Sequence, residues 1–517
     1  MRKSIILSAG AIAVLIVVVL IFMFINPSTR YARYHQHLRN PGEADLGICE
    51  VCSEDILLCT HLPIIMINTF GQEIPGRPLG FGMFNPPLEM HHIFHTTAYG
   101  ETEIDVHVSV IDNTGQWNHN IDTPMFESSA TMRIRGNSSR FFDKPNYRIR
   151  LVDENDQNNR LPLLGMDPGH EWALHGPFLD KTLMRNYMWM NIASEIMQEQ
   201  FVPEVRFFEL ILNGEFQGLY VLMETLRVET SRLNLNRYRP GMPQTSYFFG
   251  IEPRSNPGRR INTFGNYTLR LELGRDAEIL YPTYANQSEM VQNYIMGSIN
   301  TFERFLFSPE YIRHPRQIEN FIDINSFVNY FIINEFVMNN DLFANSTFFH
   351  KDVRGRLVAG PVWDFNNVLD NFFTPFPYDE FMLVGRGWFD RLMMSPYFTE
   401  RVINRWHELR RDLLSEDRLL QYMDEVEQWL GSAIDRNFEV WGFSFDYNNL
   451  SLLARRRPRS EDAALGVTVA ELNPASFEEA MEQMREVIIN RGLWMDANIE
   501  TLRKYSHPSR HALWQHP

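Results

Sequence analysis

The chain has 517 residues, of which 44% are hydrophobic and 22% are charged, and its formal net charge is −16. This length exceeds what one small core usually holds, so roughly two to four structural units are expected. A chain this acidic is repelled by phosphate backbones, which argues against non-specific binding of nucleic acid. The composition is otherwise that of an ordinary folded protein.

Residues 5–25 carry no charged side chain, which predicts one N-terminal transmembrane helix. At about 1.5 Å per residue this run spans about 31 Å, the thickness of the hydrocarbon core of a bilayer. It ends at Phe24-Ile25-Asn26-Pro27 without the small residues of a cleavage site, so we expect a retained anchor over residues 1–26. Basic residues on both sides leave the orientation open, and we expect the soluble part to lie outside the cytoplasm.

Residues 27–98 are rich in Pro, Gly and Asn, which predicts a stalk or linker. The chain has three cysteines, Cys49, Cys52 and Cys59, and all lie in this segment. With His61 they could supply four ligands to zinc. A local disulfide with one free thiol, or three inert thiols, explains the pattern as well, and the lack of a long spacer favours these. The rest of the chain has no Cys, which excludes thiol chemistry there.

Residues 99–226 have the pattern of a β-rich unit, which we expect to be an N-terminal lobe. Within residues 104–110, apolar side chains alternate with polar ones, as in a strand with one buried face. Asn213-Gly214 is the turn dipeptide that favours a tight hairpin. The further strands that we expect cover residues 130–135, 146–151, 205–212 and 219–223.

One helix is expected inside this β-rich unit. Its apolar stripe consists of residues four positions apart, namely Met184, Met188, Ile192 and Ile196. Asp180 precedes the stripe and is the predicted N-cap.

The second half of the chain changes character. Residues 227–310 contain frequent Pro and Gly and one strand pattern at residues 267–273, so we interpret them as an insert. Residues 311–508 are dominated by amphipathic helix patterns and form the expected C-terminal lobe. A β-rich first part and a helical second part predict an α+β fold with two lobes.

The pattern with the most chemical content lies at the start of the helical part. A helix runs down to Asp341, Asn345 follows, a tight hairpin intervenes, and Asp364 emerges with Phe365 from its end. Phosphoryl transfer needs one carboxylate for the acceptor hydroxyl and a second carboxylate with an amide oxygen for Mg²⁺. Two aspartates on loops are most often caps or solvated turn residues, but the order of these elements argues for chemistry.

A triphosphate also needs positive groups and backbone amides around it. Arg148 and Arg150 share one strand face with Lys144 near its start, and a short Gly/Ser loop precedes them. An exposed polar hairpin with a solvated basic face explains the same residues. The candidate ATP contacts are Arg135, Asn137, Ser138, Lys144, Arg148 and Arg150.

Glu224 is a further candidate because it ends the strand that follows the Asn-Gly turn. In a two-lobed kinase the chain crosses between lobes at this point, and its backbone pairs with adenine. A Glu that caps or forms a salt bridge at the same position is the alternative.

Four blocks of residues form one pattern: Arg135-Gly136-Asn137-Ser138 with residues 144–151, Trp172-Ala-Leu174 with Leu183-Met-Arg185-Asn186, residues 214–224, and Asn340-Asp341 to Trp363-Asp364-Phe365. The helical end adds residues 436–438 and 491–494. Together they resemble the signature of the spore coat protein H (CotH) kinase family, in the family's order, over roughly residues 100 to 505.

This resemblance implies an atypical protein-kinase-like fold that uses ATP and a divalent metal such as Mg²⁺ to phosphorylate Ser/Thr of proteins, in spore-formers on coat proteins. It implies Asp341 as the catalytic-loop carboxylate and Asp364 as the metal-binding one. Asn345 is the amide that the loop offers to the same metal. The chain departs from the family at Asn366, where members often carry a second acid. The step from Asp341 to Asn345 is also one residue shorter than in ordinary protein kinases.

Two functions therefore compete. One is an active kinase that acts on surface or coat-type proteins, and the other is an inactive kinase-fold scaffold for cell-surface or coat assembly. A glycosidase is a third reading, which would require two carboxylates flanking a sugar cleft.

Overall fold

The computed structural model describes residues 33–52, 56–78, 94–251, 260–261, 264, 277–343, 345–369, 377–450, 468, 470 and 473–507. The chain divides into two compact units, residues 1–34 and residues 35–517, and every element described lies in the second. Within the described residues, no helix combines the length and the apolar character needed to cross a membrane. The predicted anchor over residues 1–26 and the predicted strand at residues 267–273 lie outside the described residues.

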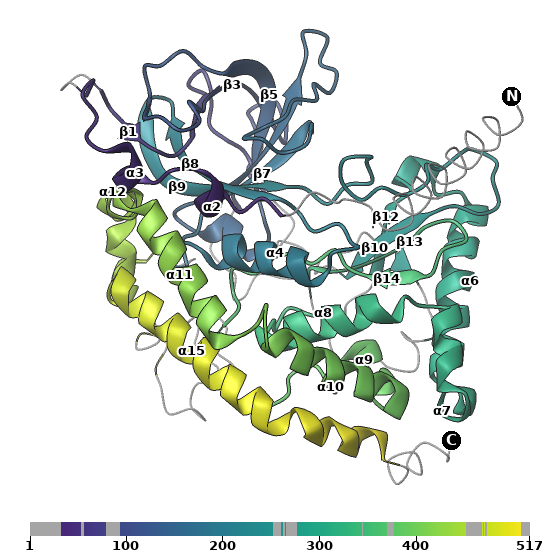
Figure 1. The fold of residues 1–517 in the computed structure, drawn as a ribbon. Coiled ribbons are helices and arrows are strands. Elements are labelled where there is room, and N and C mark those ends of the chain that lie inside the picture. Colours follow the sequence, from purple (N-terminus) through teal and green to yellow (C-terminus); the bar gives the residue numbers. More distant parts are fainter. Residues whose placement is uncertain are drawn as a thin grey trace, which may run out of the picture. The chain divides into compact units, whose positions relative to one another are not determined.

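Seven of the described strands form a closed barrel, at the upper left of Figure 1. Neighbours pair antiparallel except where β2 closes the barrel by pairing parallel with β8. The five strands predicted within residues 99–226 are confirmed, whereas β7 and β2 were not predicted, and β2 comes from the segment interpreted as a stalk. In barrel order the strands are β2 (Ile64–Asn68), β3 (Ile104–Ile111), β5 (Phe126–Arg135), β6 (Asn146–Val152), β7 (Glu171–His175), β9 (Glu215–Glu224) and β8 (Val205–Leu212).

Alternation along each strand fills the barrel. Val106 and Val108 of β3 point inward with Ile149 of β6 and Phe208 of β8, and all four are buried. Outward-facing residues of β8 and β9, such as Phe207 and Val221, belong instead to the main core of the helical region. The wall that β8 and β9 form is therefore packed on both its inner and its outer face.

Helix α4 (Arg185–Ile196) connects the barrel to the helical region, and it lies between β8 and α8 (Ile324–Phe336) in Figure 1. Its predicted stripe is buried, but so are most of its other residues. Asp180 is not the N-cap as predicted, because the helix begins at Arg185 after Met184. Asp180 nevertheless accepts a hydrogen bond from the Arg185 backbone N–H (2.8 Å), so it still satisfies a donor of the first turn.

A five-stranded antiparallel sheet joins the two halves of the chain. Its central strand β10 pairs with β12 on one side and with β13 on the other, so strands from residues 227–310 extend the hairpin that precedes Asp364. The range interpreted as an insert is thus built into the same sheet. In order, the strands are β11 (Arg260–Ile261), β12 (Ala277–Tyr281), β10 (Tyr247–Ile251), β13 (Thr347–Lys351) and β14 (Leu357–Ala359).

Helices dominate from residue 289 onward, in agreement with the predicted helical part. Aromatic and aliphatic side chains from these helices form the largest core cluster, which also takes in α4 and β10. The longer helices are α6 (Glu289–Leu306), α8, α10 (Pro396–Arg410), α11 (Glu416–Leu430), α12 (Ser432–Trp441) and α15 (Phe477–Asn498), and the short ones are α7 (Pro309–Arg313) and α9 (Gly387–Leu392).

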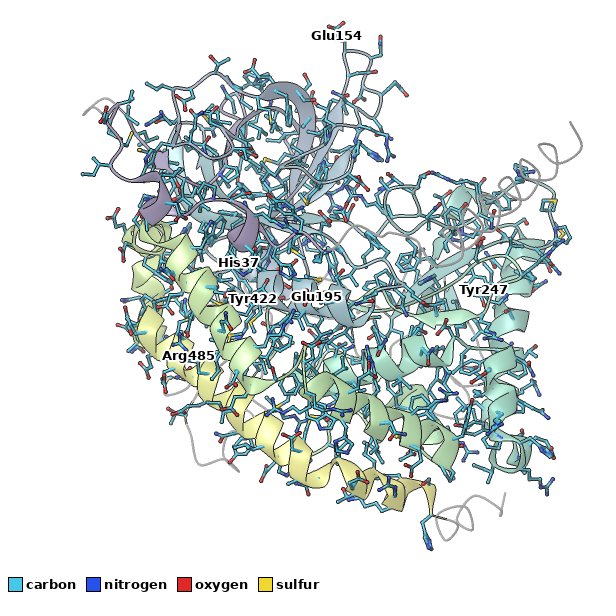
Figure 2. All side chains as sticks on the ribbon, in the orientation of Figure 1. His37, Glu154, Glu195, Tyr247, Tyr422 and Arg485 are labelled. Carbon is cyan, nitrogen blue, oxygen red and sulfur yellow. The ribbon has the colours of Figure 1, made fainter. Side chains whose placement is uncertain are left out.

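Residues 35–46 pack against this body through the short helices α2 (Gln36–Arg39) and α3 (Glu43–Leu46). The Gln36 amide exchanges two hydrogen bonds with the Phe207 backbone of β8, as a strand would (2.7 and 3.1 Å). His37 lies against Tyr422 of α11, with ring centroids 4.6 Å apart (Figure 2). This part of the predicted stalk is therefore held by both the barrel and the helices.

Candidate active site

The loop that follows α8 carries Asp341 and Asn345. The helix ends at Phe336, five residues earlier than a helix running down to Asp341 would require. The Asn345 side-chain amide donates to the Asp341 carboxylate (2.7 Å), and its backbone N–H donates to the Asp341 carbonyl (2.7 Å). The side-chain oxygen of Asn345 is buried and has no hydrogen-bond partner among the described residues. That oxygen is available to a ligand.

The hairpin of β13 and β14 returns the chain to this loop, as predicted, and Asp364 follows it. Two residues at the start of α4 hold the returning segment. The Asn186 side chain accepts the Phe365 backbone N–H (2.8 Å), and the Arg185 guanidinium donates to the Val368 carbonyl (3.0 Å). The sequence pattern that contained Arg185 and Asn186 gave no reason to assign them this positioning role.

The two predicted aspartates act on each other electrostatically. Burial and the negative charge of Asp341 raise the pKa of Asp364 to about 6, against the opposing charge of Arg135 and a hydrogen bond from Ser346. Two carboxylates that repel each other in a half-buried site bind a divalent cation favourably, because the cation removes the repulsion.

Backbone strain gathers at the same place. Met338, Phe343, Ser346 and Asp364 all adopt left-handed conformations, with φ between +44° and +66°, although none is Gly. Such conformations cost about 1–3 kcal/mol each and persist where the surroundings enforce them, most often at functional sites. The loop and the hairpin end are therefore held in a defined geometry.

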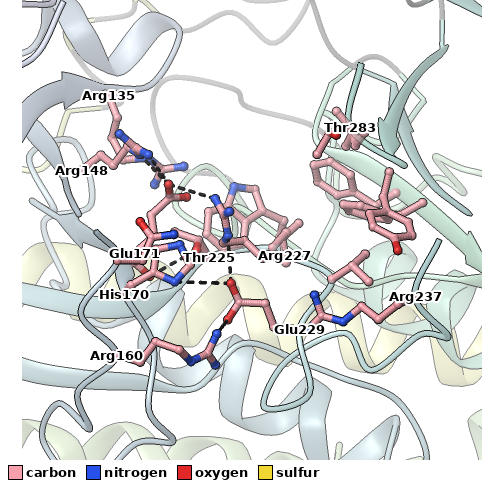
Figure 3. Close-up of a pocket in the computed structure, with 18 of the residues that line it drawn as sticks. Arg135, Arg148, Arg160, His170, Glu171, Thr225, Arg227, Glu229, Arg237 and Thr283 are labelled. Atoms are coloured by element: carbon pink, nitrogen blue, oxygen red, sulfur yellow. Dashed lines mark hydrogen bonds and ion pairs between the residues drawn. The ribbon is translucent and has the colours of Figure 1, made fainter. Parts of the chain in front are cut away.

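A cavity of about 700 Å³ lies between β5–β7 of the barrel and the five-stranded sheet (Figure 3), and its wall includes Trp363, which precedes Asp364 in the chain. Arg135 joins the cavity to the pair, because it lies over the Trp363 ring (5.3 Å) and its charge acts on Asp364. On the sheet side the wall is aromatic, with Phe248, Tyr281 and Phe348 beside Trp363. The arginines in the wall are Arg133, Arg135, Arg148, Arg160, Arg227 and Arg237.

Two glutamates partly neutralise these arginines. Glu171 accepts hydrogen bonds from Arg148 (2.8 Å from Nε) and from Arg227 (3.1 Å), and Glu229 pairs with Arg227 and Arg160. Burial raises the pKa of Glu171, but the charges of Arg227 and Arg148 outweigh it and leave the pKa lowered. Both glutamates are thus held ionised within an excess of arginines, on a chain whose net charge is −16.

The structure places the remaining predicted contacts elsewhere. Lys144 is 1% exposed, and its ammonium donates to the Leu219 carbonyl (2.6 Å) and to the Asn437 side chain (2.7 Å). Arg150 is not part of the cavity wall, and it donates to Asp156 and to Asn158, of which only Asn158 lines the cavity (both 3.3 Å). Among the predicted basic residues, the structure brings only Arg135 and Arg148 to the cavity wall.

Asn137 and Ser138 follow the left-handed Gly136 and begin a short 3₁₀ turn, Ser138–Phe141. They do not line the cavity, and their loop is fixed by Arg140, which donates to the Gly136 carbonyl (2.6 Å). Glu224 is buried and accepts the Glu204 backbone N–H (3.0 Å), with Arg232 beside it at 3.6 Å. This arrangement is the structural alternative that the sequence left open for Glu224.

Sequence reasoning missed both cavity glutamates and four of the cavity arginines, namely Arg133, Arg160, Arg227 and Arg237. The Arg227-Val-Glu229 alternation, which puts two opposite charges on one face, was the available signal. The aromatic wall of the cavity left no such signal in the sequence, because its residues come from strands that are separated by long stretches of chain.

His61 is not close to the three cysteines as the zinc alternative required. Its ring contacts Trp429 (centroids 5.3 Å apart) and lies 3.5 Å from the Glu43 carboxylate.

Comparison with known proteins places these features in one family. The model of the family described as CotH kinase protein matches residues 132–495, most of the chain, including Asp341, Asp364 and the cavity arginines. No curated protein matches the chain. Because the match covers the barrel strands from β5 onward, the five-stranded sheet and the helices up to α15, the chain belongs to the CotH kinase protein family.

Proposed function

We propose that the chain is an ATP-dependent protein kinase that phosphorylates Ser or Thr, with the barrel and the helical region as the two lobes of an atypical kinase fold. Family membership supports a kinase-like function. The observation that carries the proposal is the buried side-chain oxygen of Asn345, which has no hydrogen-bond partner among the described residues and belongs to the same loop as Asp341, whose charge acts on Asp364. An amide oxygen and carboxylates are the donors that Mg²⁺ prefers.

In this proposal Asp364 and Asn345 hold Mg²⁺, and the arginines of the cavity hold the phosphates. Arginine is suited to this because its planar fork binds phosphate oxygens in pairs. The aromatic wall beside Trp363 offers a stacking surface for adenine. When bound, Mg²⁺ and ATP supply the phosphoryl group and screen its charge.

Asp341 is assigned to the acceptor hydroxyl. Its carboxylate is oriented by the amide of Asn345, which leaves the other carboxylate oxygen to accept the Ser or Thr hydroxyl proton. Arg135 lies between the cavity and Asp364 and is placed to bind the phosphate that is transferred.

The test separates binding from transfer. We expect Mg-ATP to raise the melting temperature of the purified chain and to label it by autophosphorylation. Asp364→Asn should abolish the Mg²⁺-dependent shift, and Asp341→Asn should keep the shift but lower labelling by about 10²–10⁴-fold. Asp105→Asn, at an exposed position near the start of β3, is the matched control. A chain that binds Mg-ATP without labelling, or does neither, is a scaffold instead.

We also propose that residues 1–26 anchor the chain in a membrane with the folded part outside the cytoplasm. The apolar run without a cleavage motif supports this. Protease added to intact cells should digest the folded part, and removal of residues 1–26 should release the chain from the membrane fraction. Protection of the folded part from protease would show that it lies inside the cell.

A further inference from the structure

Three cysteines and one histidine converge at the edge of the barrel. The sulfurs of Cys49, Cys52 and Cys59 and one ring nitrogen of His119 all lie within 4.8 Å of one another. His119 Nε2 is 3.2 Å from the Cys49 sulfur and 3.9 Å from the Cys52 sulfur. Tetrahedral zinc sets neighbouring ligand atoms about 3.5–3.8 Å apart, since its bonds to sulfur and nitrogen are about 2.3 and 2.0 Å.

The backbone accounts for this convergence. β1 (Cys59–Thr60) pairs antiparallel with β4 (Asn118–His119), and Cys59 is directly opposite His119 in the ladder. Directly opposed residues have Cβ atoms about 4.5–5.5 Å apart, so their side chains reach a common point. Cys49 and Cys52 come from the segment before the ladder, with the two-residue spacing that is typical of a zinc-binding turn.

The histidine is oriented as a ligand. Its side chain is 7% exposed, and Nδ1 lies 3.3 Å from the Asp122 carboxylate. The same carboxylate oxygen accepts the His119 backbone N–H (2.9 Å) and the Asn113 amide (2.8 Å), so it is fixed in place. A carboxylate that accepts a hydrogen bond from one ring N–H fixes the proton there and leaves the lone pair of the other nitrogen, here Nε2, directed at the sulfurs.

We propose that these four residues bind one structural Zn²⁺. Four protein ligands close a tetrahedral site and leave no position for a substrate, which is the pattern of structural zinc. The ladder that the ion would reinforce has only two residues in each strand, and so short a hairpin is marginal in water. None of the three cysteines forms a disulfide in the structure, and a disulfide between any two would leave the third unpaired.

The test uses the full chain, purified in mild detergent without chelator. Elemental analysis should find one zinc per chain, and replacement by Co²⁺ should give the visible d–d absorption of a tetrahedral thiolate site. His119→Gln and Cys52→Ser should lose the metal, whereas His61→Gln should keep it. Asp122→Asn should lower the zinc affinity by about 10–100-fold in competition with a chelating dye.

The cobalt spectrum is recorded on the unaltered chain, so the test does not depend on whether a variant folds. A chain without metal that carries a disulfide by mass spectrometry overturns the proposal. Retention of zinc in His119→Gln together with its loss in His61→Gln does so as well. These outcomes are independent of Mg-ATP binding, so neither proposal depends on the other.

Discussion

Arg491 of α15 and Glu335 of α8 form an ion pair in which both side chains are fully buried. Arg491 also donates to the carbonyls of Tyr378 and Glu380 (both 2.7 Å), and Glu335 accepts the backbone N–H of Leu383 (2.7 Å). The pair thereby fixes residues 378–383 against two helices. From this segment the chain leads to Arg386, which donates to the carbonyl and the side chain of Asn340 (both 2.9 Å), next to Asp341.

We predict that Arg491→Met lowers the free energy of unfolding by about 3–5 kcal/mol, because it leaves the Glu335 charge buried without its partner. Urea-induced unfolding, followed by tryptophan fluorescence, measures this. Arg313→Met removes an exposed pair with Glu310 and should change stability by about 0.5 kcal/mol or less. Equal effects of the two substitutions would contradict the assignment of Arg491 to the core.

The raised pKa of Asp364 predicts a pH-dependent penalty in the metal-free chain. Its folded pKa of about 6 exceeds the ordinary value of 3.8, so the folded state binds the extra proton between these values. The stability from this group is therefore present below pH 4 and declines as the pH rises toward 6. With chelator present, Asp364→Asn should be more stable than the unaltered chain by about 1–3 kcal/mol at pH 7.5.

That difference should vanish below pH 4, where both side chains are neutral. Unfolding curves at a series of pH values measure it, with Asp105→Asn as the exposed control. A destabilised Asp364→Asn variant at neutral pH would show that the two carboxylates do not repel each other.

Arg135 and Arg150 provide a matched pair for the cavity. We predict that Arg135→Met weakens ATP binding by about 10–100-fold, since a hydrogen bond to a charged group contributes about 1.5–3 kcal/mol. Arg150→Met should leave the dissociation constant unchanged, because Arg150 is not part of the cavity wall and its guanidinium is already bound to Asp156 and Asn158. Calorimetric titration with ATP measures both. Comparable losses would place the nucleotide on the open face of β6.

The placement of Lys144 predicts a structural effect. Its two acceptors come from β9 and α12, and burial lowers the pKa of Lys144 well below its usual range. Lys144→Met should lower the free energy of unfolding by about 1–3 kcal/mol, because the Leu219 carbonyl loses its buried donor. The affinity for ATP, measured on the folded variant, should not change. A tenfold weaker affinity for ATP would instead support the phosphate contact that the sequence predicted for Lys144.

These residues also show what the sequence could predict. Alternation predicted β3 and β6 correctly, because each depends on neighbouring residues. The order of loop, hairpin and aspartate predicted that Asp341 and Asp364 share one site, and the charge of Asp341 does act on Asp364. The sequence did not predict the cavity, because its aromatic wall depends on the pairing of β10 with β13, two segments about a hundred residues apart. The prediction for Lys144 was wrong because Lys144 and Pro145 precede β6, which begins at Asn146. The alternation that places Arg148 on an outer face of the strand therefore does not extend to Lys144.

The zinc ligands illustrate the same limit. The sequence showed the three cysteines as a group, and His61 is the histidine closest to them along the chain. The pairing of β1 with β4 instead brings His119 to them in the folded protein. Local spacing identifies a metal-binding turn, and the sheet register selects the last ligand.

The parallel pairing of β2 with β8 sets the minimal folding unit of this protein. A chain shortened to begin at residue 99 would lack β2 and would leave β3 and β8 with unpaired backbone groups along two open edges. Such edges recruit strands from other molecules. During synthesis, β2 cannot pair with β8 until residues 205–212 have been made. One edge of β2 therefore stays unpaired until then, and the amino-terminal region is exposed to aggregation.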